Sequence, residues 1–182
     1  MKSGTVLLAL MIVLKTGAAE AGSADDCALT TNPIAALQSC TRIIESGDIG
    51  PELRAKALLN RGNALQNRGD LARAIDDYNE AKGLDPKFAL AFNNRGVALR
   101  VEGNLARAIA DFDEAIRLEP RFALAYYNRG LAHLTLGDVG RAIADYDEAI
   151  RLAPQFKDGF YNRRCDGGPA IRQIADAEFD TD

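Results

Sequence analysis

The sequence predicts an all-α protein in which a short, cleaved leader precedes an array of antiparallel helix pairs. Three observations lead to this fold class: an apolar run at the N-terminus, a 34-residue internal repeat, and apolar residues at helical spacing within each repeat. The chain has 182 residues, 47% of them hydrophobic, which suits one repeat array rather than several domains. Its formal net charge of −4 gives no electrostatic reason to bind nucleic acid, whose recognition depends on clustered Lys and Arg.

Residues 1–21 have the features of a secretory signal peptide. A charged start precedes the nine-residue apolar run Val6–Leu14, which is shorter than the run of about 20 apolar residues that spans a bilayer. Ala19–Ala21 fits a signal-peptidase site, with Gly22–Ala24 as a second option. The alternative is an apolar N-terminal helix that belongs to the fold. We therefore expect a periplasmic or secreted protein without a membrane span.

Export affects the interpretation of the three cysteines, because disulfides persist in oxidising compartments. The segment between Cys27 and Cys40 contains the turn-forming residues 31–33, which let the chain double back. Compartment and spacing favour a disulfide over two independent thiols, and the chain-entropy model gives such a bridge about 3 kcal/mol of stabilisation. Cys165 is then left over, either as a small buried side chain or as a thiol that links a homodimer.

A 34-residue period organises the middle of the chain. In each unit, apolar residues at helical spacing run up to a Gly turn, resume after it and stop at a Pro, so each unit is two helices. Gly on the first helix and Ala on the second let the two backbones approach, while an aromatic residue fills the gap to the neighbouring unit. A single pair cannot cover its apolar side, so the units must stack. The recurring positions are Gly62, Gly96 and Gly130; Ala74, Ala108 and Ala142; Tyr78, Phe112 and Tyr146; and Pro86, Pro120 and Pro154.

These units resemble the tetratricopeptide repeat (TPR) family, in which Gly and a large apolar residue on the first helix are followed by Ala, an aromatic residue, Ala and Pro. The pattern is matched over residues 55–88, 89–122 and 123–156, with His133 in place of the large apolar residue of the third unit. The resemblance implies a right-handed superhelical array, the TPR solenoid, whose first helices line a concave groove.

Each unit also carries an Arg where the family more often has Leu. We expect each of these arginines to pair with an Asp on the second helix. Because this charge ladder repeats with the fold, we interpret it as a structural feature. The pairs are Arg61 with Asp77, Arg95 with Asp111, and Arg129 with Asp145.

Both ends depart from the repeat pattern. Residues 22–54 contain one helix without a matching first helix, with Cys40 interpreted as occupying the aromatic position, and they predict an N-terminal helical cap held by the Cys27–Cys40 bridge. Residues 157–182 begin a fourth unit, but Arg164 stands where Gly is required. That unit is therefore expected to be incomplete and to end in a tail.

The sequence contains no residue constellation for catalysis, for a cofactor or for a metal. Asp111 and Asp113 look like a metal-binding D-x-D pair, but residues two apart on a helix point about 200° from each other and cannot grip one ion. His133 has no second His or Cys at a metal-binding spacing and is expected in or near the core. We therefore predict that the protein is not an enzyme.

The resemblance places function in the concave groove, which suits extended or helical peptides. TPR domains that hold the acidic tails of chaperones use two Asn and several basic residues there. Asn63 and Asn94 match those Asn, but Leu59, Leu124 and Asn128 take the basic positions, which disfavours chaperone tails. The expected lining is Lys56, Leu59, Asn63, Gln66, Leu90, Asn93, Asn94, Val97, Arg100, Leu124, Tyr127, Leu131, Leu134, Asp158 and Tyr161.

The C-terminal part of this lining predicts an exposed apolar patch formed by Leu124, Tyr127, Leu131 and Leu134. Such a patch either binds a partner or is covered by the protein's own tail through Ile171, Ile174 and Phe179. We therefore expect a non-catalytic adaptor or scaffold for a protein or peptide partner that the sequence does not name. Two alternatives stay open: a secreted effector that acts on host proteins, and a homo-oligomeric structural protein of the envelope.

Overall fold

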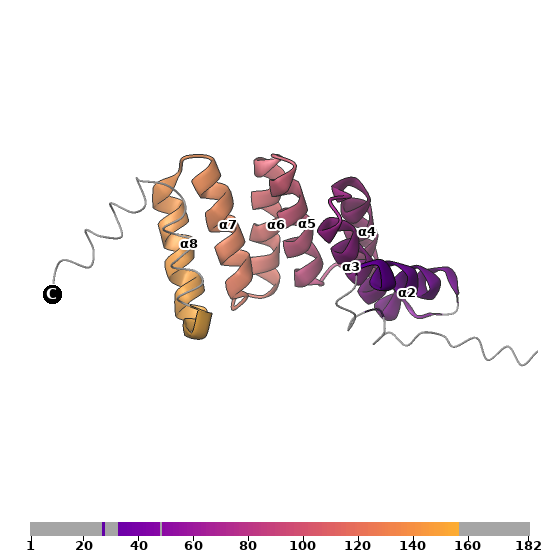
Figure 1. The fold of residues 1–182 in the computed structure, drawn as a ribbon. Coiled ribbons are helices and arrows are strands. Elements are labelled where there is room, and N and C mark those ends of the chain that lie inside the picture. Colours follow the sequence, from indigo (N-terminus) through magenta and orange to yellow (C-terminus); the bar gives the residue numbers. More distant parts are fainter. Residues whose placement is uncertain (1–26, 28–32, 48, 157–182) are drawn as a thin grey trace, which may run out of the picture.

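The computed structural model describes residue 27 and residues 33–47 and 49–156, and these residues form an array of helices (Figure 1). Helix α2 is followed by three antiparallel pairs, α3 with α4, α5 with α6, and α7 with α8, which lie side by side in chain order. The all-α array of helix pairs predicted from the repeat is thus confirmed. The helices are α2 (Pro33–Glu45), α3 (Pro51–Asn67), α4 (Leu71–Leu84), α5 (Ala89–Val101), α6 (Leu105–Leu118), α7 (Ala123–Thr135), α8 (Val139–Leu152) and the short 3₁₀ turn η1 (Pro154–Phe156).

Two predicted segments, the signal peptide 1–21 and the incomplete fourth unit with its tail 157–182, lie outside the described residues. The groove residues Asp158 and Tyr161, and Cys165, lie outside them too. Within the described part of the chain, no helix has the length and apolar character needed to cross a membrane.

Glycine turns set the geometry of each pair. Gly69, Gly103 and Gly137 have φ of 81°, 83° and 78°, in the left-handed region where only Gly is free of strain. The second helix of each pair ends two residues before a Pro, which cannot continue the helix. These local signals explain why the 34-residue period of the sequence becomes a period of the structure.

A close contact between Gly and an aromatic ring holds the two helices of a pair together. A Cβ atom added to Gly62 would lie 2.6 Å from Cε1 of Tyr78, and one added to Gly96 would lie 2.6 Å from Cε1 of Phe112. Real Cβ atoms do not approach other atoms this closely, so each ring occupies space that only Gly leaves open. These distances place each ring against the glycine of its own pair. The expectation that the ring also fills the gap to the neighbouring unit stays a prediction.

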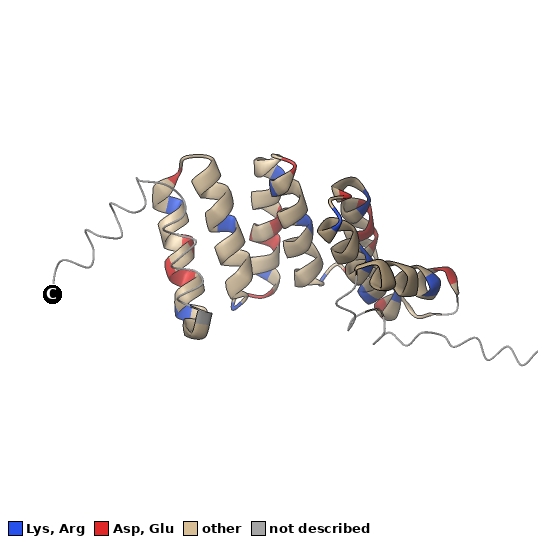
Figure 2. Cartoon of the chain, in the orientation of Figure 1, with Lys and Arg blue, Asp and Glu red and all other residues tan. Residues whose placement is uncertain are grey.

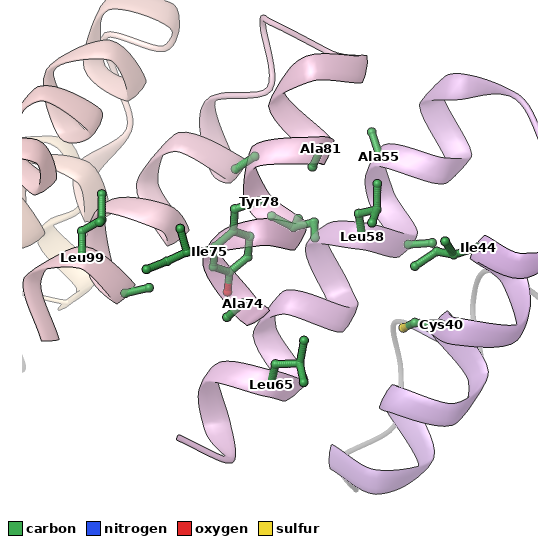
Figure 3. Packing of buried hydrophobic residues seen from close by; sticks show 14 of the residues in the cluster. Cys40, Ile44, Ala55, Leu58, Leu65, Ala74, Ile75, Tyr78, Ala81 and Leu99 are labelled. Carbon is green, nitrogen blue, oxygen red and sulfur yellow. The ribbon is translucent and has the colours of Figure 1, made fainter. Parts of the chain in front are cut away.

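The N-terminal cap continues the core of the array. Helix α2 packs against α3, and Cys40 and Ile44 belong to the same buried cluster as Leu58 and Tyr78 (Figure 3). By the 34-residue spacing, the aromatic position of the cap falls on Ile44, whereas Cys40 takes the small position equivalent to Ala74. Cys40 therefore does not occupy the aromatic position, contrary to the prediction.

The expected disulfide is present. Cys27 and Cys40 are joined by an S–S bond with their Cα atoms 4.9 Å apart, and both side chains are buried. Because both cysteines share a buried cluster with residues of α3, the bridge secures the cap at the point where it packs on the first pair.

Candidate functional site

The first helices of the three pairs form one continuous face of the array. Helix α3 contacts α5, and α5 contacts α7, so equivalent positions of successive pairs lie next to one another. We call this surface the inner face. Of the residues predicted to line the groove, those that are described and not buried are assigned to it: Lys56, Asn63, Gln66, Leu90, Asn94, Val97, Arg100, Leu124, Leu131 and Leu134.

A chain of side-chain amides runs across the first helices. Asn128 donates to Asn93 at 3.0 Å, Asn93 donates to Asn94 at 3.0 Å, and Asn94 donates to Asn63 at 2.8 Å. The hydroxyl of Tyr78 also donates to Asn63, at 2.9 Å. The sequence gives no signal for this chain, because hydrogen bonds between α3, α5 and α7 depend on how the helices stack. It fixes the relative position of the three helices at the floor of the inner face.

One predicted groove position belongs to the core instead. Leu59, Asn93 and Tyr127 are equivalent residues of the three pairs, and their exposed fractions are only 4%, 4% and 2%. Tyr127 packs on Tyr146 with ring centroids 5.7 Å apart. Stacking of the first helices buries this position, so the prediction that it lines the groove is wrong.

The apolar patch of the inner face is correspondingly smaller than predicted. Leu131 and Leu134 are partly buried against the core of the third pair. Leu124 is 50% exposed, and its equivalent Leu90 is 38% exposed. Leu90 and Leu124 are therefore the large apolar side chains of this face that are exposed.

The arginine ladder has the predicted pairs, and it also joins neighbouring helix pairs. Arg129 contacts Asp145 in its own pair at 2.6 Å and Asp113 in the preceding pair at 2.6 Å. Arg95 likewise joins Asp111 in its own pair at 2.5 Å and also donates to Asn79 in the preceding pair. The hydrogen bonds that Arg129 donates to Asp145 raise the pKa of Arg129, while burial opposes this change.

The ladder explains the D-x-D spacing without a metal. Asp111 accepts from Arg95, and Asp113 accepts from Arg129, so the two carboxylates serve arginines of different helix pairs. Lys82 adds a second cation beside Asp111 at 3.5 Å and lies 3.9 Å from the centroid of the Phe92 ring. Within the described residues, no cluster of three or more His, Cys, Asp or Glu side chains is arranged to hold a metal ion. Figure 2 shows basic and acidic positions interspersed along the helices rather than gathered in one patch.

A hollow lies between the second and third pairs. A cavity of about 340 Å³ is bordered by Asp113, Arg129, His133, Arg141 and Asp145, together with Ile109 and Ala144. His133 is buried, as expected, and its Nε2 lies 4.0 Å from Asp145. Burial lowers the pKa of His133, and Asp145 acts in the opposite direction. Burial thus favours the neutral form of the imidazole.

The helical array and its inner face define a helical-repeat scaffold of the protein–protein interaction class. Residues 55–88 and residues 93–155 each match a model of the tetratricopeptide repeat. The chain belongs to the TPR family. No curated protein sequence matches it.

Solved TPR structures share this fold. The first TPR domain of Spaghetti (RPAP3), solved with the HSP90 peptide SRMEEVD, is 27% identical with a TM-score of 0.60, over 72% of this chain and 98% of that chain. The second TPR domain of the same protein, bound to the same peptide, is 30% identical with a TM-score of 0.53, over 54% of this chain and 91% of that chain. MamA is 24% identical with a TM-score of 0.60, over 68% of this chain and 70% of that chain, and shows the fold alone.

Proposed function

We propose that this protein is an exported, non-catalytic adaptor that binds a protein or peptide partner on its inner face. The observation that carries the proposal is the pairing of Leu90 with Leu124, two exposed apolar side chains at equivalent positions of adjacent first helices. Exposed apolar groups beside partly buried polar groups are typical of peptide-binding surfaces. The two Spaghetti TPR domains, which were solved with a bound peptide, support the same use of the fold.

The buried disulfide supports the exported location. A Cys27–Cys40 bridge in the core of the cap persists in an oxidising compartment and is rare in a reducing cytosol. Together with the apolar leader at residues 1–21, it favours the periplasm or the extracellular space. Alkylation of free thiols in intact cells tests this part. We expect Cys27 and Cys40 to be protected until a reductant is added, and modification of both without reductant would contradict export.

Crosslinking of the mature protein in its native envelope fraction tests the adaptor function. The parent is compared with the double variant Leu90→Glu/Leu124→Glu, and Ile34→Glu on α2 is the matched control because it is 54% exposed on a helix outside the inner face. We expect a specific partner to be captured by the parent and the control but not by the double variant. Equal capture by all three, with helicity unchanged by circular dichroism, would remove the inner face from the function.

A further inference from the structure

We propose that the hollow between the second and third helix pairs binds a primary alkylammonium group, that of a small amine or of a lysine side chain. The hollow is bordered by side chains of α6, α7 and α8. None of these side chains belongs to the inner face, so such binding does not depend on the proposed adaptor function. The hollow, the charges around it and a buried imidazole together indicate this ligand.

The hollow is open to solvent and extends to buried groups of the third pair. Asp113, Arg141 and Ala144 are exposed and lie at its mouth. Asp145 and His133 are buried and lie at its inner end. The volume of about 340 Å³ is far more than one water molecule requires, so a small molecule or a long side chain can enter.

The buried carboxylate at the inner end differs in its surroundings from the equivalent carboxylate of the second pair. That equivalent, Asp111, lies beside two cations, Arg95 at 2.5 Å and Lys82 at 3.5 Å. The position of Lys82 is taken by Ile116 in the next unit, so Asp145 does not receive an ammonium from the preceding pair. A lysine beside this aspartate is thus a feature of the fold that one junction between pairs has and the next does not.

One cation serves two carboxylates at the hollow. Arg129 contacts both Asp145 and Asp113 at 2.6 Å. The equivalent of Asp113 in the first pair is Asn79, which is neutral. The junction between the second and third pairs therefore carries an excess of negative charge where the preceding junction carries an excess of positive charge. A cation is the ligand that balances it.

A buried imidazole adds an acceptor at the inner end of the hollow. His133 is 4% exposed and makes no hydrogen bond among the described residues: its Nδ1 is buried without a partner, and its Nε2 lies 4.0 Å from Oδ2 of Asp145. When Nδ1 carries the proton of the neutral ring, Nε2 and Oδ2 are both acceptors. They cannot bond to each other, but one ammonium nitrogen between them can lie within about 2.9 Å of each. An anion at the same place would meet a carboxylate.

The other lining residues suit the alkyl part of such a ligand. Ile109 of α6 and Ala144 of α8 give the hollow apolar groups on both of these helices. Long amine side chains commonly lay their methylene groups along apolar surface and keep the charged group among polar partners. Arg141 also borders the hollow, but Asp138 at 2.5 Å balances its charge.

Titration of the full mature chain with small amines, followed by two-dimensional amide NMR at neutral pH, tests the proposal. The probes are pentylamine and lysine with its α-amino and carboxyl groups blocked, and pentanol is the uncharged control. The parent is compared with Asp113→Asn and His133→Leu, which introduce the residues that the first pair has at Asn79 and Leu65. Asp76→Asn is the matched control, because Asp76 is exposed on α4 and does not border the hollow.

We expect pentylamine to bind saturably and to shift the amide resonances of residues 109–113 and 129–145, and we expect pentanol not to do so at the same concentration. Asp113→Asn and His133→Leu should each weaken amine binding roughly tenfold, since each removes an acceptor from a charged donor. Asp76→Asn should bind like the parent. Blocked lysine that binds at least as tightly as pentylamine would assign the hollow to a lysine of a partner protein, and binding of pentylamine alone would assign it to a small amine.

Three outcomes would overturn the proposal. Equal affinity for pentylamine and pentanol would show that the hollow selects an apolar chain rather than an ammonium group. Unchanged amine affinity in a folded variant would remove its side chain from the site, and Asp113→Asn is decisive here because Asp113 is exposed and its replacement leaves the core intact. Resonances that do not shift with either amine would remove the site itself. The adaptor function, which is tested by Leu90→Glu/Leu124→Glu, would stand in all three cases.

Discussion

The first and third helix pairs share one backbone arrangement, but the hydroxyls of their equivalent tyrosines, Tyr78 and Tyr146, differ in hydrogen bonding. In the first pair, Tyr78 is satisfied by Asn63 and Gln66 and is tied into the amide chain that reaches Asn128. In the third pair, Tyr146 packs on the same glycine position, but Leu131 and Leu134 replace its acceptors. The comparison teaches that the positions that pack the repeat are held constant, while the inner-face positions vary and decide whether the buried hydroxyl has an acceptor.

Loss of a ladder arginine should have the largest effect on stability. The loss should be larger in the third pair than in the first. Arg129→Leu leaves the buried Asp145 unpaired and releases Asp113, and we expect a loss of about 3 kcal/mol in the free energy of unfolding. Arg61→Leu should cost less, because Arg61 hydrogen-bonds one carboxylate, Asp77. Urea unfolding of both variants measures the difference, and equal losses would show that the contact between pairs adds nothing.

Replacing the glycine that contacts the aromatic ring should cost a similar amount of stability in the first and third pairs. Gly130→Ala forces a Cβ to within 2.8 Å of the Tyr146 ring, and we expect a loss of about 2 kcal/mol from overpacking. Gly62→Ala should lose a similar amount against Tyr78. Gly140→Ala is the control: its Cβ meets nothing within 4 Å, so stability should stay the same or rise by less than about 1 kcal/mol. Thermal unfolding monitored by circular dichroism gives all three values, and a tolerated Gly130→Ala would refute the close-packing argument.

Removal of the hydroxyl should distinguish the two phenols. Tyr78→Phe breaks the hydrogen bond to Asn63, and we expect a loss of about 1 kcal/mol. Tyr146→Phe should cost nothing, because its hydroxyl has no hydrogen-bond partner in the structure. Parallel denaturant titrations test the contrast. A cost for Tyr146→Phe as large as that for Tyr78→Phe would show that the hydroxyl of Tyr146 makes a hydrogen bond as well.

The smallest expected effect is the pH dependence of stability that His133 contributes. His133 stands where the first and second pairs have Leu65 and Leu99. Burial holds the pKa of His133 below its ordinary value of 6.5. The unfolded chain therefore takes up the proton first as the pH falls, and stability decreases below about pH 6.5 until the folded pKa is passed. His133→Leu should remove this decrease. Melting temperatures at pH 7.5 and 5.5 test it, and an unchanged difference between the two pH values would assign the effect to other groups.

Periodic signals in the sequence predict the framework of the molecule. The 34-residue recurrence of Gly, Ala, an aromatic residue and Pro indicates two helices per unit, because each residue type acts locally or within its own pair. The Arg61–Asp77 pairing and its equivalents are also readable, since a charge repeated at a fixed spacing meets its partner in every unit. The Cys27–Cys40 bridge follows from spacing and from the expectation of export.

The inner face is less predictable, because its exposure depends on contacts between units. The family pattern predicts Asn93 and Tyr127 as groove residues, but stacking of adjacent first helices buries both. The sharing of Arg129 between Asp113 and Asp145 depends on the same stacking. The sequence by itself determined the helices, their pairing and the ladder, because these follow from short-range periodicity and complementary charge. Only the tertiary structure decided which side chains of the first helices are buried and which are left for a partner, because burial depends on the packing of residues that are about 34 positions apart.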